Sequence, residues 1–295
     1  MPLNADQFDL TVVVPSYSSG ATLHRCLEAI EMQLTTLRYR VVVMHSGTEG
    51  IPDEVIQSNP NVEFHIAPER RLPGIQRNVG ARAAGTRWIA FVDSDCVVGP
   101  TWLDVLVCEL TETGAVGAGA ALAGEPASGV SWVMHMLEFG TWLPGHRSGD
   151  VRDLPSCDIV YDRARFLAAG GFPEDLFPCE DTALNVKLRQ DGHRLRFVGE
   201  VTATHIHLRT AKEVLRHNAR LGLMYGAVVD LTGQSRRLRS RAAIPLVVAA
   251  RLAGVLVRTL RYRPRDFTQL IAARTLLFKC VASWARGFST SAPHV

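Results

Sequence analysis

Short apolar runs alternate with helical patterns along the first two thirds of the chain. The runs have the length of buried strands and are rich in branched and aromatic side chains: residues 10–14, 39–44, 62–66 and 88–92. Apolar residues then recur at helical spacing over residues 23–34, with Thr22 as the expected N-terminal cap, and over residues 75–84. Strands that alternate with helices in this way predict βαβ units, and hence an α/β fold with a mainly parallel sheet.

Three further elements are expected later in this region. Residues 114–124 are rich in glycine and alanine but lack the Gly-Lys-Ser or Gly-Lys-Thr sequence of a phosphate-binding loop, so they predict a tightly packed strand with its turn. A helical pattern begins at Glu180. Residues 198–207 predict a strand that places His205 and His207 on the same face of the sheet.

The composition fits one α/β domain with an appendage. With 295 residues, of which 47% are hydrophobic, the chain has enough apolar material for a substantial core. The net charge of +3 is too small to indicate a nucleic-acid-binding protein. The six cysteines include no Cys-x-x-Cys pair, which favours reduced thiols in a cytosolic compartment. Residues 1–9 lack a basic segment and an apolar run, so we expect no secretory signal and a cytoplasmic location.

Two carboxylates directly follow the strand predicted at residues 88–92. In Asp93-Ser94-Asp95 both acidic side chains lie near one edge of the sheet, where they can hold a divalent cation against the phosphates of a nucleotide. The alternative is a solvated polar turn, which is the more common role of such a triplet on its own. Ligands gather beyond the carboxyl ends of parallel strands, so we expect three turns to converge there: Pro15-Ser16-Tyr17-Ser18, His45-Ser46-Gly47 and Asp93-Ser94-Asp95.

With these motifs the chain resembles the family 2 glycosyltransferases, which have the GT-A fold. The resemblance rests on the order and spacing of several motifs: Val-Val-Val-Pro-Ser-Tyr at 12–17, Ser-Gly-Thr at 46–48, Arg77-Asn78-Val79-Gly80, Asp93-Ser94-Asp95, Gly170-Gly171-Phe172-Pro173-Glu174, Glu180-Asp181 and His205-Ile206-His207. It implies transfer of a sugar from a nucleoside diphosphate donor with inversion at the anomeric carbon. It also implies Mn²⁺ or Mg²⁺ as the cofactor, because a bound cation stabilises the charge of the departing nucleoside diphosphate.

The resemblance assigns roles to four carboxylates. Asp95 corresponds to the direct metal ligand, and Asp93 to a residue that serves the nucleotide or the metal shell. Asp181 corresponds to the general base that removes the proton of the acceptor hydroxyl, and Glu180 to an acceptor contact. Spacing alone favours a simpler role for the last two, since acidic residues in the first turn of a helix are stabilised by the macrodipole.

Histidines and turn residues complete the implied site. His205 matches a histidine that completes the metal site in several relatives, and it matches that position better than His207 does. Relatives commonly carry a base-reading aspartate where this chain has His45, so the resemblance does not imply a uracil base here. Ser18 stands where relatives often have asparagine. The donor-binding residues implied by the resemblance are Pro15, Ser16, Tyr17, His45, Ser46, Gly47, Arg77, Asn78, Asp93 and Ser94.

The composition changes abruptly toward the C-terminus. Residues 236–286 contain twelve basic residues and a single acidic one. Residues 242–260 are apolar apart from one threonine and the two arginines Arg251 and Arg258, which share a helical face. A central arginine disfavours a helix that crosses a membrane, so one prediction is an amphipathic helix in an anionic membrane surface, repeated at residues 270–284. The other is a helical cap packed on the preceding domain.

Together these patterns predict two parts of the chain. Residues 1–210 form a GT-A catalytic domain, with a nucleotide-sugar half at about 1–115 and an acceptor half at about 116–210. Residues 211–295 form a basic helical extension. The aromatic segment 132–147 is a candidate acceptor lid, although core packing explains its pattern equally well.

The predicted function is that of a metal-dependent inverting glycosyltransferase on the inner face of a membrane. Its expected partners are a nucleotide-sugar donor, a glycan, lipid-linked or small-molecule acceptor and an anionic membrane surface, without nucleic acid. One alternative is a non-catalytic relative, against which Asp93, Asp95 and Asp181 argue. The other is a nucleotidyltransferase, which usually has a glycine-rich, lysine-bearing loop after its first strand, and this chain has none there.

Overall fold

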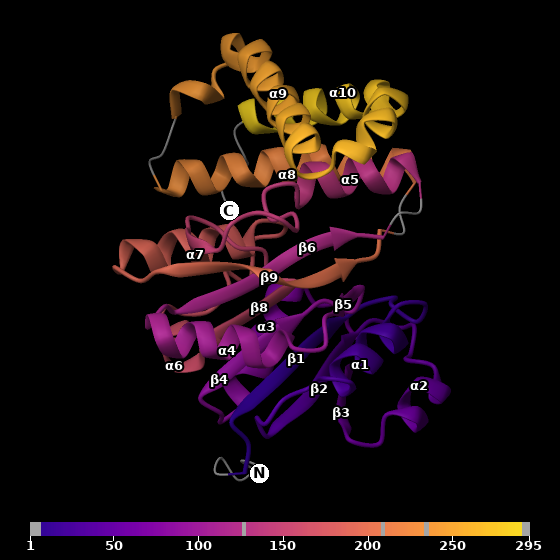
Figure 1. The fold of residues 1–295 in the computed structure, drawn as a ribbon, viewed down its shortest axis with the longest axis vertical. Coiled ribbons are helices and arrows are strands. Elements are labelled where there is room, and N and C mark those ends of the chain that lie inside the picture. The colour runs from indigo at the N-terminus through magenta and orange to yellow at the C-terminus, as the bar shows by residue number, and fades with distance from the viewer. Residues whose placement is uncertain (1–6, 126–127, 208–209, 233–235, 291–295) are drawn as a thin grey trace.

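The computed structural model describes residues 7–125, 128–207, 210–232 and 236–290. Within these residues a nine-stranded sheet forms the centre of the molecule, in the order β3-β2-β1-β4-β8-β6-β9-β5, with β7 paired to β9 (Figure 1). The strands are β1 (Leu10–Ser16), β2 (Tyr39–Ser46), β3 (Val62–Ala67), β4 (Trp88–Val92), β5 (Cys96–Val98), β6 (Gly117–Gly124), β7 (Gly149–Val151), β8 (Asp158–Asp162) and β9 (Leu195–His205). The helices are α1 (Leu23–Glu31), α2 (Asp53–Ser58), α3 (Pro73–Ala83), α4 (Trp102–Thr113), α5 (Gly129–Glu138), α6 (Arg163–Ala168), α7 (Glu180–Gln190), α8 (Ala211–Thr232), α9 (Ile244–Tyr262) and α10 (Phe267–Ser289).

The first half of the sheet is parallel, as the sequence predicts. β1 lies between β2 and β4, with Val12 opposite both Val41 and Ala90. Side chains alternate along β1, so that Val12 and Val14 belong to one core cluster and Val13 to another. Helices α1 and α4 cover the first side of the sheet, and α3, α6 and α7 cover the second. Because β1, β2 and β4 end at one edge, the turns that follow them lie on the same side of the molecule.

The second half of the sheet reverses direction. β8 runs antiparallel to both β4 and β6, and β5 runs antiparallel to β9. The sheet is therefore mixed, as predicted, and the strand predicted within residues 114–124 is β6. β9 ends at His205, so His207 lies beyond the strand predicted to contain it. The two rings nevertheless stack, with 4.4 Å between their centroids.

The prediction for α1 is wrong in two details. The helix ends before Leu34, because the backbone N–H of Leu34 donates instead to the carbonyl oxygen of Pro100, and the leucine side chain is exposed. Thr22 precedes the helix without capping it, since its hydroxyl donates to the carbonyl oxygen of Ser19. The start and the end of α1 thus depend on contacts that the periodicity of the sequence does not reveal.

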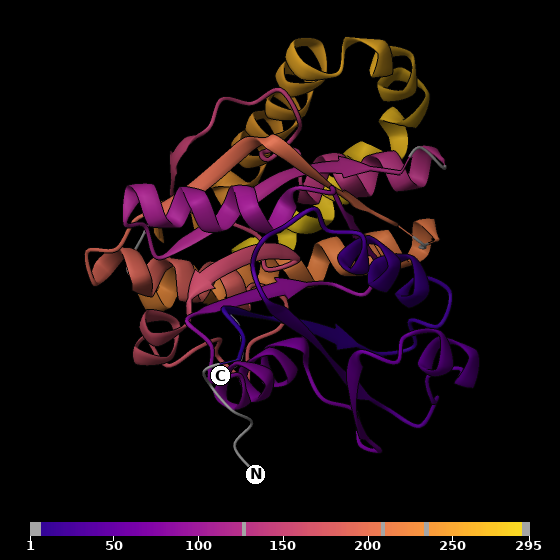
Figure 2. The same cartoon turned by 60° about the horizontal axis from the view of Figure 1, so that its bottom comes forward.

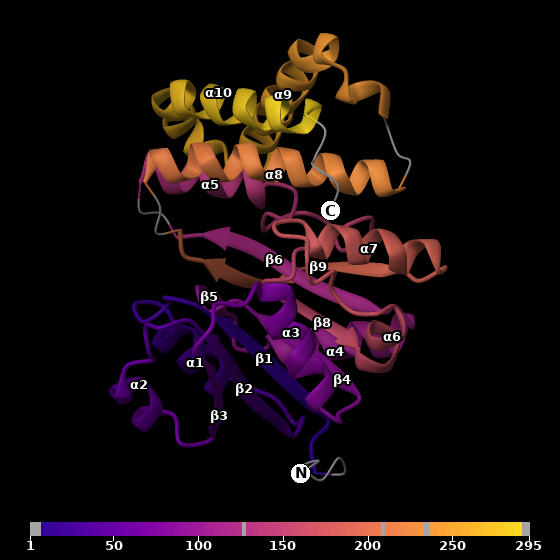
Figure 3. The same ribbon diagram turned by 180° about the vertical axis from the view of Figure 1, so that it is seen from behind.

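Helices α5, α8, α9 and α10 form a layer beside the second half of the sheet (Figures 1 and 3). α10 and α8 approach each other closely at small residues. A Cβ on Gly222 would lie 2.0 Å from the carbonyl oxygen of Trp284, and one on Gly287 would lie 2.2 Å from that of Ala219. The helical extension is thus packed on the rest of the chain through α8 and α5.

Helix α9 turns its two arginines inward, which agrees with the predicted helical cap and differs from the alternative in which the arginines face a membrane. The guanidinium carbon of Arg251 lies 3.9 Å from the ring centroid of Trp284, and Arg258 Nε lies 3.1 Å from the place of a Cβ on Gly140. The side of α9 that carries the arginines therefore packs against the rest of the protein. The exposed positions between residues 246 and 260 are all apolar: Leu246, Ala249, Ala250, Ala253, Leu256, Val257 and Leu260.

The α9–α10 pair lies at the end of the molecule away from β1, β2 and β3 (Figures 1 and 2). Among the described residues, the helical stretch Arg241–Tyr262 is long and apolar enough to cross a membrane by length and composition, and 22% of its most apolar window is buried. Length and composition alone do not separate a spanning helix from a helix of a soluble core.

The packing of α3 on β1 depends on Gly80. A Cβ there would lie 2.7 and 2.8 Å from the two methyl carbons of buried Val13. We expect Gly80→Ala to lower the free energy of unfolding in denaturant titrations by about 1–3 kcal/mol through overpacking. Gly129→Ala in α5 is the control, because the nearest atom to its Cβ would be 3.9 Å away, on Ala273. Equal effects of the two substitutions would contradict the packing argument.

Candidate active site

A cleft of about 910 Å³ lies between the ends of the parallel strands and the helical layer. One wall comes from the turns after β1 and β4 and from the start of α7, and the other comes from α5, α8, α9 and α10. The predicted site residues that line the cleft are Tyr17, Arg77, Asp93, Ser94, Asp95, Glu180, Asp181 and His205.

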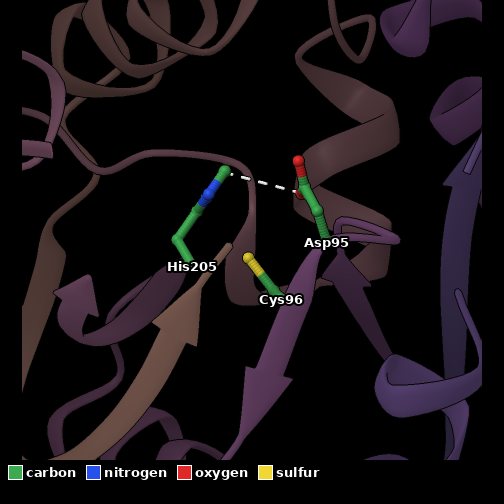
Figure 4. Close-up of side chains that lie close together, drawn as sticks. All are labelled: Asp95, Cys96 and His205. Carbon is green, nitrogen blue, oxygen red and sulfur yellow. Dashed lines mark ion pairs between the residues drawn. The ribbon is translucent and has the colours of Figure 1, made fainter. Parts of the chain in front are cut away.

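Asp95 and His205 meet where β5 pairs with β9. The antiparallel register sets Cys96 opposite His205, and the N–H of Ile206 donates to the carbonyl oxygen of Asp95 at 2.8 Å. The Nε2 of His205 then lies 3.5 Å from Oδ1 of Asp95 (Figure 4). With Cys96 Sγ, they form a group whose possible ligand atoms all lie within 4.8 Å of one another. Of these three residues, Cys96 is the one that the sequence motifs do not indicate.

The donor set of this group fits a divalent cation such as Mn²⁺. A carboxylate and an imidazole suit Mn²⁺ better than they suit Mg²⁺, which prefers oxygen ligands alone. Burial raises the pKa of Asp95 and His205 lowers it, while the Asp93 carboxylate raises it further. A cation would stabilise the charged form of Asp95. Burial also raises the pKa of the Cys96 thiol, so Asp95 and His205 are better candidate ligands than Cys96.

Arg77 joins the two acidic motifs of the cleft. From α3, its Nη2 donates to Oδ1 of Asp93 at 2.5 Å and its Nη1 donates to Oε1 of Glu180 at 2.9 Å. The arginine is 2% exposed. Although burial lowers the pKa of Arg77, the carboxylates of Asp93 and Glu180 raise it well above its usual range. Arg77 is therefore a fixed cation that orients both carboxylates. Asp93 is not a member of the group formed by Asp95, Cys96 and His205.

Asp181 is held at the start of α7 by two backbone donors. The N–H of Ser156 donates to Oδ2 of Asp181 at 3.1 Å, and the N–H of Thr182 donates to Oδ1 at 2.7 Å. Burial raises the pKa of Asp181. Burial and the Asp181 carboxylate also raise the pKa of Glu180 to about 7 and that of Asp153 to about 7. A cluster of such carboxylates can take up a proton near neutral pH, as a general base must.

The residues of the turn after β2 bond within the protein and do not line the cleft. His45 is 3% exposed, its Nδ1 lies 2.9 Å from the hydroxyl oxygen of Ser16, and its Nε2 lies 2.6 Å from the carbonyl oxygen of Glu49. Both ring nitrogens are thus used within the protein. The hydroxyl of Ser46 accepts from the N–H of Arg71. His45 and Ser46 do not line the cleft, so the structure does not bring the middle of the three turns into contact with it.

Three other predicted donor residues lie away from the cleft. The side-chain amide of Asn78 accepts from the N–H of Phe172 at 2.9 Å and donates to its carbonyl oxygen at 2.8 Å, which ties α3 to the loop before α7. Pro15 lies within β1, in register with Met44. Gly47 backs the ring of Tyr17, since a Cβ on the glycine would lie 3.1 Å from that ring. None of these three predicted residues lines the cleft.

The helical layer adds acidic and histidine side chains that the sequence motifs do not indicate. Glu138 at the end of α5 lies 3.3 Å from Nε2 of His217 in α8. Burial raises the pKa of Glu138, but His217 and the nearby His205 and His207 lower it to about 2. The aromatic segment predicted as an acceptor lid is thus α5 and its following turn, which form part of the cleft wall.

Removal of Arg77 tests its role as the shared counter-charge. We expect Arg77→Met to lower the free energy of unfolding by about 3–5 kcal/mol, because Asp93 and Glu180 lose their buried partner. The loss should shrink as the pH falls below about 7, where Glu180 is protonated. Arg82→Met is the control on the same helix. Its ion pair with Glu174 is exposed, so its effect should stay within about 1 kcal/mol. A loss for Arg77→Met that does not change with pH contradicts the interpretation.

Sequence comparisons identify relatives of this chain. Residues 11–167, more than half of the chain, match the family model described as glycosyl transferase family 2. The pre-mycofactocin glycosyltransferase of Mycobacterium tuberculosis is 27% identical over 231 residues, which cover 75% of this chain and 47% of that protein. Glycosyltransferase AglE of Haloferax volcanii is 23% identical over 219 residues, which cover 72% of this chain and 71% of that protein. The chain spans about half the length of the mycobacterial relative.

Solved structures share the fold. The mannosyltransferase PcManGT of Pyrobaculum calidifontis, in complex with GDP-Man and Mn²⁺, has a TM-score of 0.61 and 18% identity, covering 94% of this chain and 86% of that one. S. aureus TarS in complex with UDP-GlcNAc has a TM-score of 0.57 and 16% identity, covering 95% and 89%. These similarities confirm the predicted GT-A type of α/β fold. By its match over residues 11–167, the chain belongs to glycosyl transferase family 2.

Proposed function

We propose that the protein is a metal-dependent inverting glycosyltransferase, which transfers a sugar from a nucleoside diphosphate donor to a hydroxyl group of an acceptor. One observation carries the proposal: the candidate metal ligands Asp95 and His205 and the candidate base Asp181 line a single cleft. Family membership supports it, as do the nucleotide sugars bound to two proteins of the same fold.

The donor occupies the part of the cleft formed by the turns after β1 and β4. Tyr17 is 46% exposed there, with the guanidinium carbon of Arg70 4.5 Å from its ring centroid. Mn²⁺ held by Asp95 and His205 would stabilise the negative charge of the leaving nucleoside diphosphate. Since both nitrogens of His45 are bonded within the protein, the nucleotide base is selected without a direct contact to that histidine.

Asp181 accepts the proton of the acceptor hydroxyl as the new bond to carbon forms. Its two backbone donors fix the direction of the carboxylate, so that positioning contributes alongside basicity. The raised pKa of Asp181, caused by burial, makes it a stronger base than an exposed aspartate. Inversion follows if the hydroxyl attacks from the side of the sugar opposite the diphosphate. Glu180, held by Arg77, then stands beside the base as an acceptor contact.

We also propose that the protein binds peripherally to the inner face of a membrane through the outer side of α9. Leu246, Leu256 and Val257 are 63%, 40% and 58% exposed, and they lie on the apolar side of that helix. Exposed arginines at its ends, Arg241 and Arg261, are placed to meet anionic headgroups. The inward arginines favour a helix that lies on the surface, since a helix that crossed the membrane would carry them into the bilayer.

Nucleotide binding tests the donor site. Calorimetric titrations with UDP, GDP, dTDP and CDP, each with and without Mn²⁺, should find one nucleotide that binds only when the metal is present. Asp95→Asn should weaken this binding about tenfold or more, because the metal loses a charged ligand. If none of the four nucleotides binds with Mn²⁺, the donor-site assignment is wrong.

Asp181→Asn is the matched variant that separates binding from turnover. It should keep the affinity for the nucleotide but slow the release of nucleoside diphosphate from the corresponding nucleotide sugar, with water as acceptor, by about 10²–10⁴-fold. In the unmodified protein this rate should fall as the pH falls through the raised pKa of Asp181, because the base becomes protonated. Release of pyrophosphate would instead indicate nucleotidyl transfer, and binding without turnover would indicate a non-catalytic relative.

Vesicle binding tests the membrane surface. We expect the protein to sediment with vesicles that contain phosphatidylglycerol. The double variant Leu256→Glu, Val257→Glu should bind these vesicles at least about tenfold more weakly. Burial of one such side chain is worth about 1.5–3 kcal/mol. Met32→Glu is the control, because Met32 is 66% exposed but lies next to α1, outside the helical layer. Equal binding of the double variant and the control would exclude α9 as the contact.

A further inference from the structure

Arg251 brings a positive charge into the cleft without a counter-charge. It lies on the inward side of α9 and lines the cleft together with Tyr225 and Trp284. Its guanidinium carbon lies 3.9 Å from the ring centroid of Trp284. Among the described residues it makes no hydrogen bond or ion pair, and its Nε is buried without a partner. Packing on Trp284 holds the group in place where it lines the cleft.

The surroundings of Arg251 increase the cost of its charge. Elsewhere in the fold, Arg77 and Arg40 each lie against carboxylates. The charged side chain nearest in sequence on the inner side of α9 is another cation, Arg258, whose Nε is also buried without a partner in the described chain. Burial and, to a smaller extent, the positive charge of Arg258 lower the pKa of Arg251 to about 10, while Tyr225 raises it. Two uncompensated guanidinium groups are costly in a folded protein, which favours a role in binding an anion for Arg251, the one that lines the cleft.

We propose that Arg251 binds a phosphate group of the acceptor, so that this enzyme glycosylates a phosphate-bearing molecule. The inference rests on the proposed glycosyltransferase function and names the class of its acceptor. A guanidinium offers N–H donors in a planar fork that matches two oxygens of a phosphate. Stacking on Trp284 fixes the plane of that fork, and Arg258 adds the positive potential that suits a doubly charged anion.

The charges in the cleft orient such an acceptor. Asp153, Glu180 and Asp181 gather at the start of α7, where they repel a phosphate and accept hydrogen bonds from hydroxyl groups. Arg251 stands in the opposite, helical wall. The phosphate therefore binds under α9 and the reacting hydroxyl lies toward Asp181. A neutral acceptor has no group for Arg251, and an acceptor bound the other way round places its phosphate against carboxylates.

Calorimetry with simple phosphates tests the inference. With a chelator present to exclude metal, phenyl phosphate should bind to the full-length protein, and benzyl alcohol, its uncharged counterpart, should not. Arg251→Met should weaken the binding of phenyl phosphate about tenfold or more, and Arg251→Lys should weaken it less because the charge remains. Arg265→Met is the matched control, because Arg265 is exposed in the turn between α9 and α10 and should not affect the affinity.

Thermal unfolding separates a binding role from a structural one. If Arg251 serves a ligand, Arg251→Met removes an uncompensated buried charge, so the midpoint of unfolding should stay the same or rise. Unchanged affinity for phenyl phosphate in a folded Arg251→Met variant overturns the proposal. Equal binding of phenyl phosphate and benzyl alcohol to the unmodified protein also overturns it.

Two further arms separate this inference from the donor site and identify the source of the phosphate. The titrations are repeated with the nucleoside diphosphate and Mn²⁺ already bound. Retained phosphate binding shows that the subsite is distinct, and loss of phosphate binding shows that the phosphate had occupied the donor site, which overturns the inference while leaving the proposed function intact. Tighter binding of decyl phosphate than of phenyl phosphate, lost in Arg251→Met, indicates a lipid phosphate. Equal affinities indicate a soluble one.

Discussion

The chemistry of the cleft depends on one guanidinium between two acidic motifs. Arg77 bonds to Asp93, 16 residues further along the chain, and to Glu180, 103 residues further along. Without a cation at this point, the neighbouring carboxylates would repel one another, and burial would raise the pKa of Glu180 further. Arg77 lowers the pKa of Glu180 against the effect of burial, and it holds Asp93 and Glu180 by hydrogen bonds in the same cleft as Asp95 and Asp181. It thereby connects the part of the fold that would hold the donor to the part that would hold the base.

The position of Arg77 follows from how α3 sits on the sheet. The side-chain amide of the preceding residue, Gln76, donates to the carbonyl oxygens of Ser16 at 3.0 Å and Met44 at 2.6 Å, at the ends of β1 and β2. One turn further along, Gly80 allows the helix backbone to approach the methyl groups of Val13. Gln76 fixes the helix along the strands, and Gly80 sets its distance from them. Arg77, the next residue on this helix, then lies between the two carboxylates. The packing of the α3 backbone on the sheet thus sets the position of its guanidinium group.

Much of the fold and part of the site could be predicted from the sequence. Apolar runs locate the buried strands, and parallel strand ends explain why Tyr17, Asp93 and Asp95 line one cleft. Asp181, in the first turn of α7, is indicated by the resemblance of motifs. Resemblance of motifs could not show that His45 has its two ring nitrogens bonded internally, because that depends on Ser16 and Glu49. Residues such as Glu138 and Asp153 enter the cleft through tertiary packing and belong to no local pattern. Helical periodicity shows that Arg251 and Arg258 share a face, but it does not show which face turns inward.

That orientation gives α9 a polarity opposite to that of an ordinary surface helix, which buries its apolar side and exposes its charges. Its outward side chains, among them Leu246 and Val257, lack a cover in the described part of the chain, and its inward Arg251 lacks a counter-charge. A membrane would cover the apolar side chains, and an anion in the cleft would pair with Arg251. An amphiphilic phosphate would connect the two, because its chain can stay in the bilayer beneath α9 while its head reaches Arg251. The outward and inward sides of α9 thus both favour an acceptor that has an apolar chain and a phosphate group. The stability of the isolated protein explains neither the exposed apolar side chains nor the unpaired arginine.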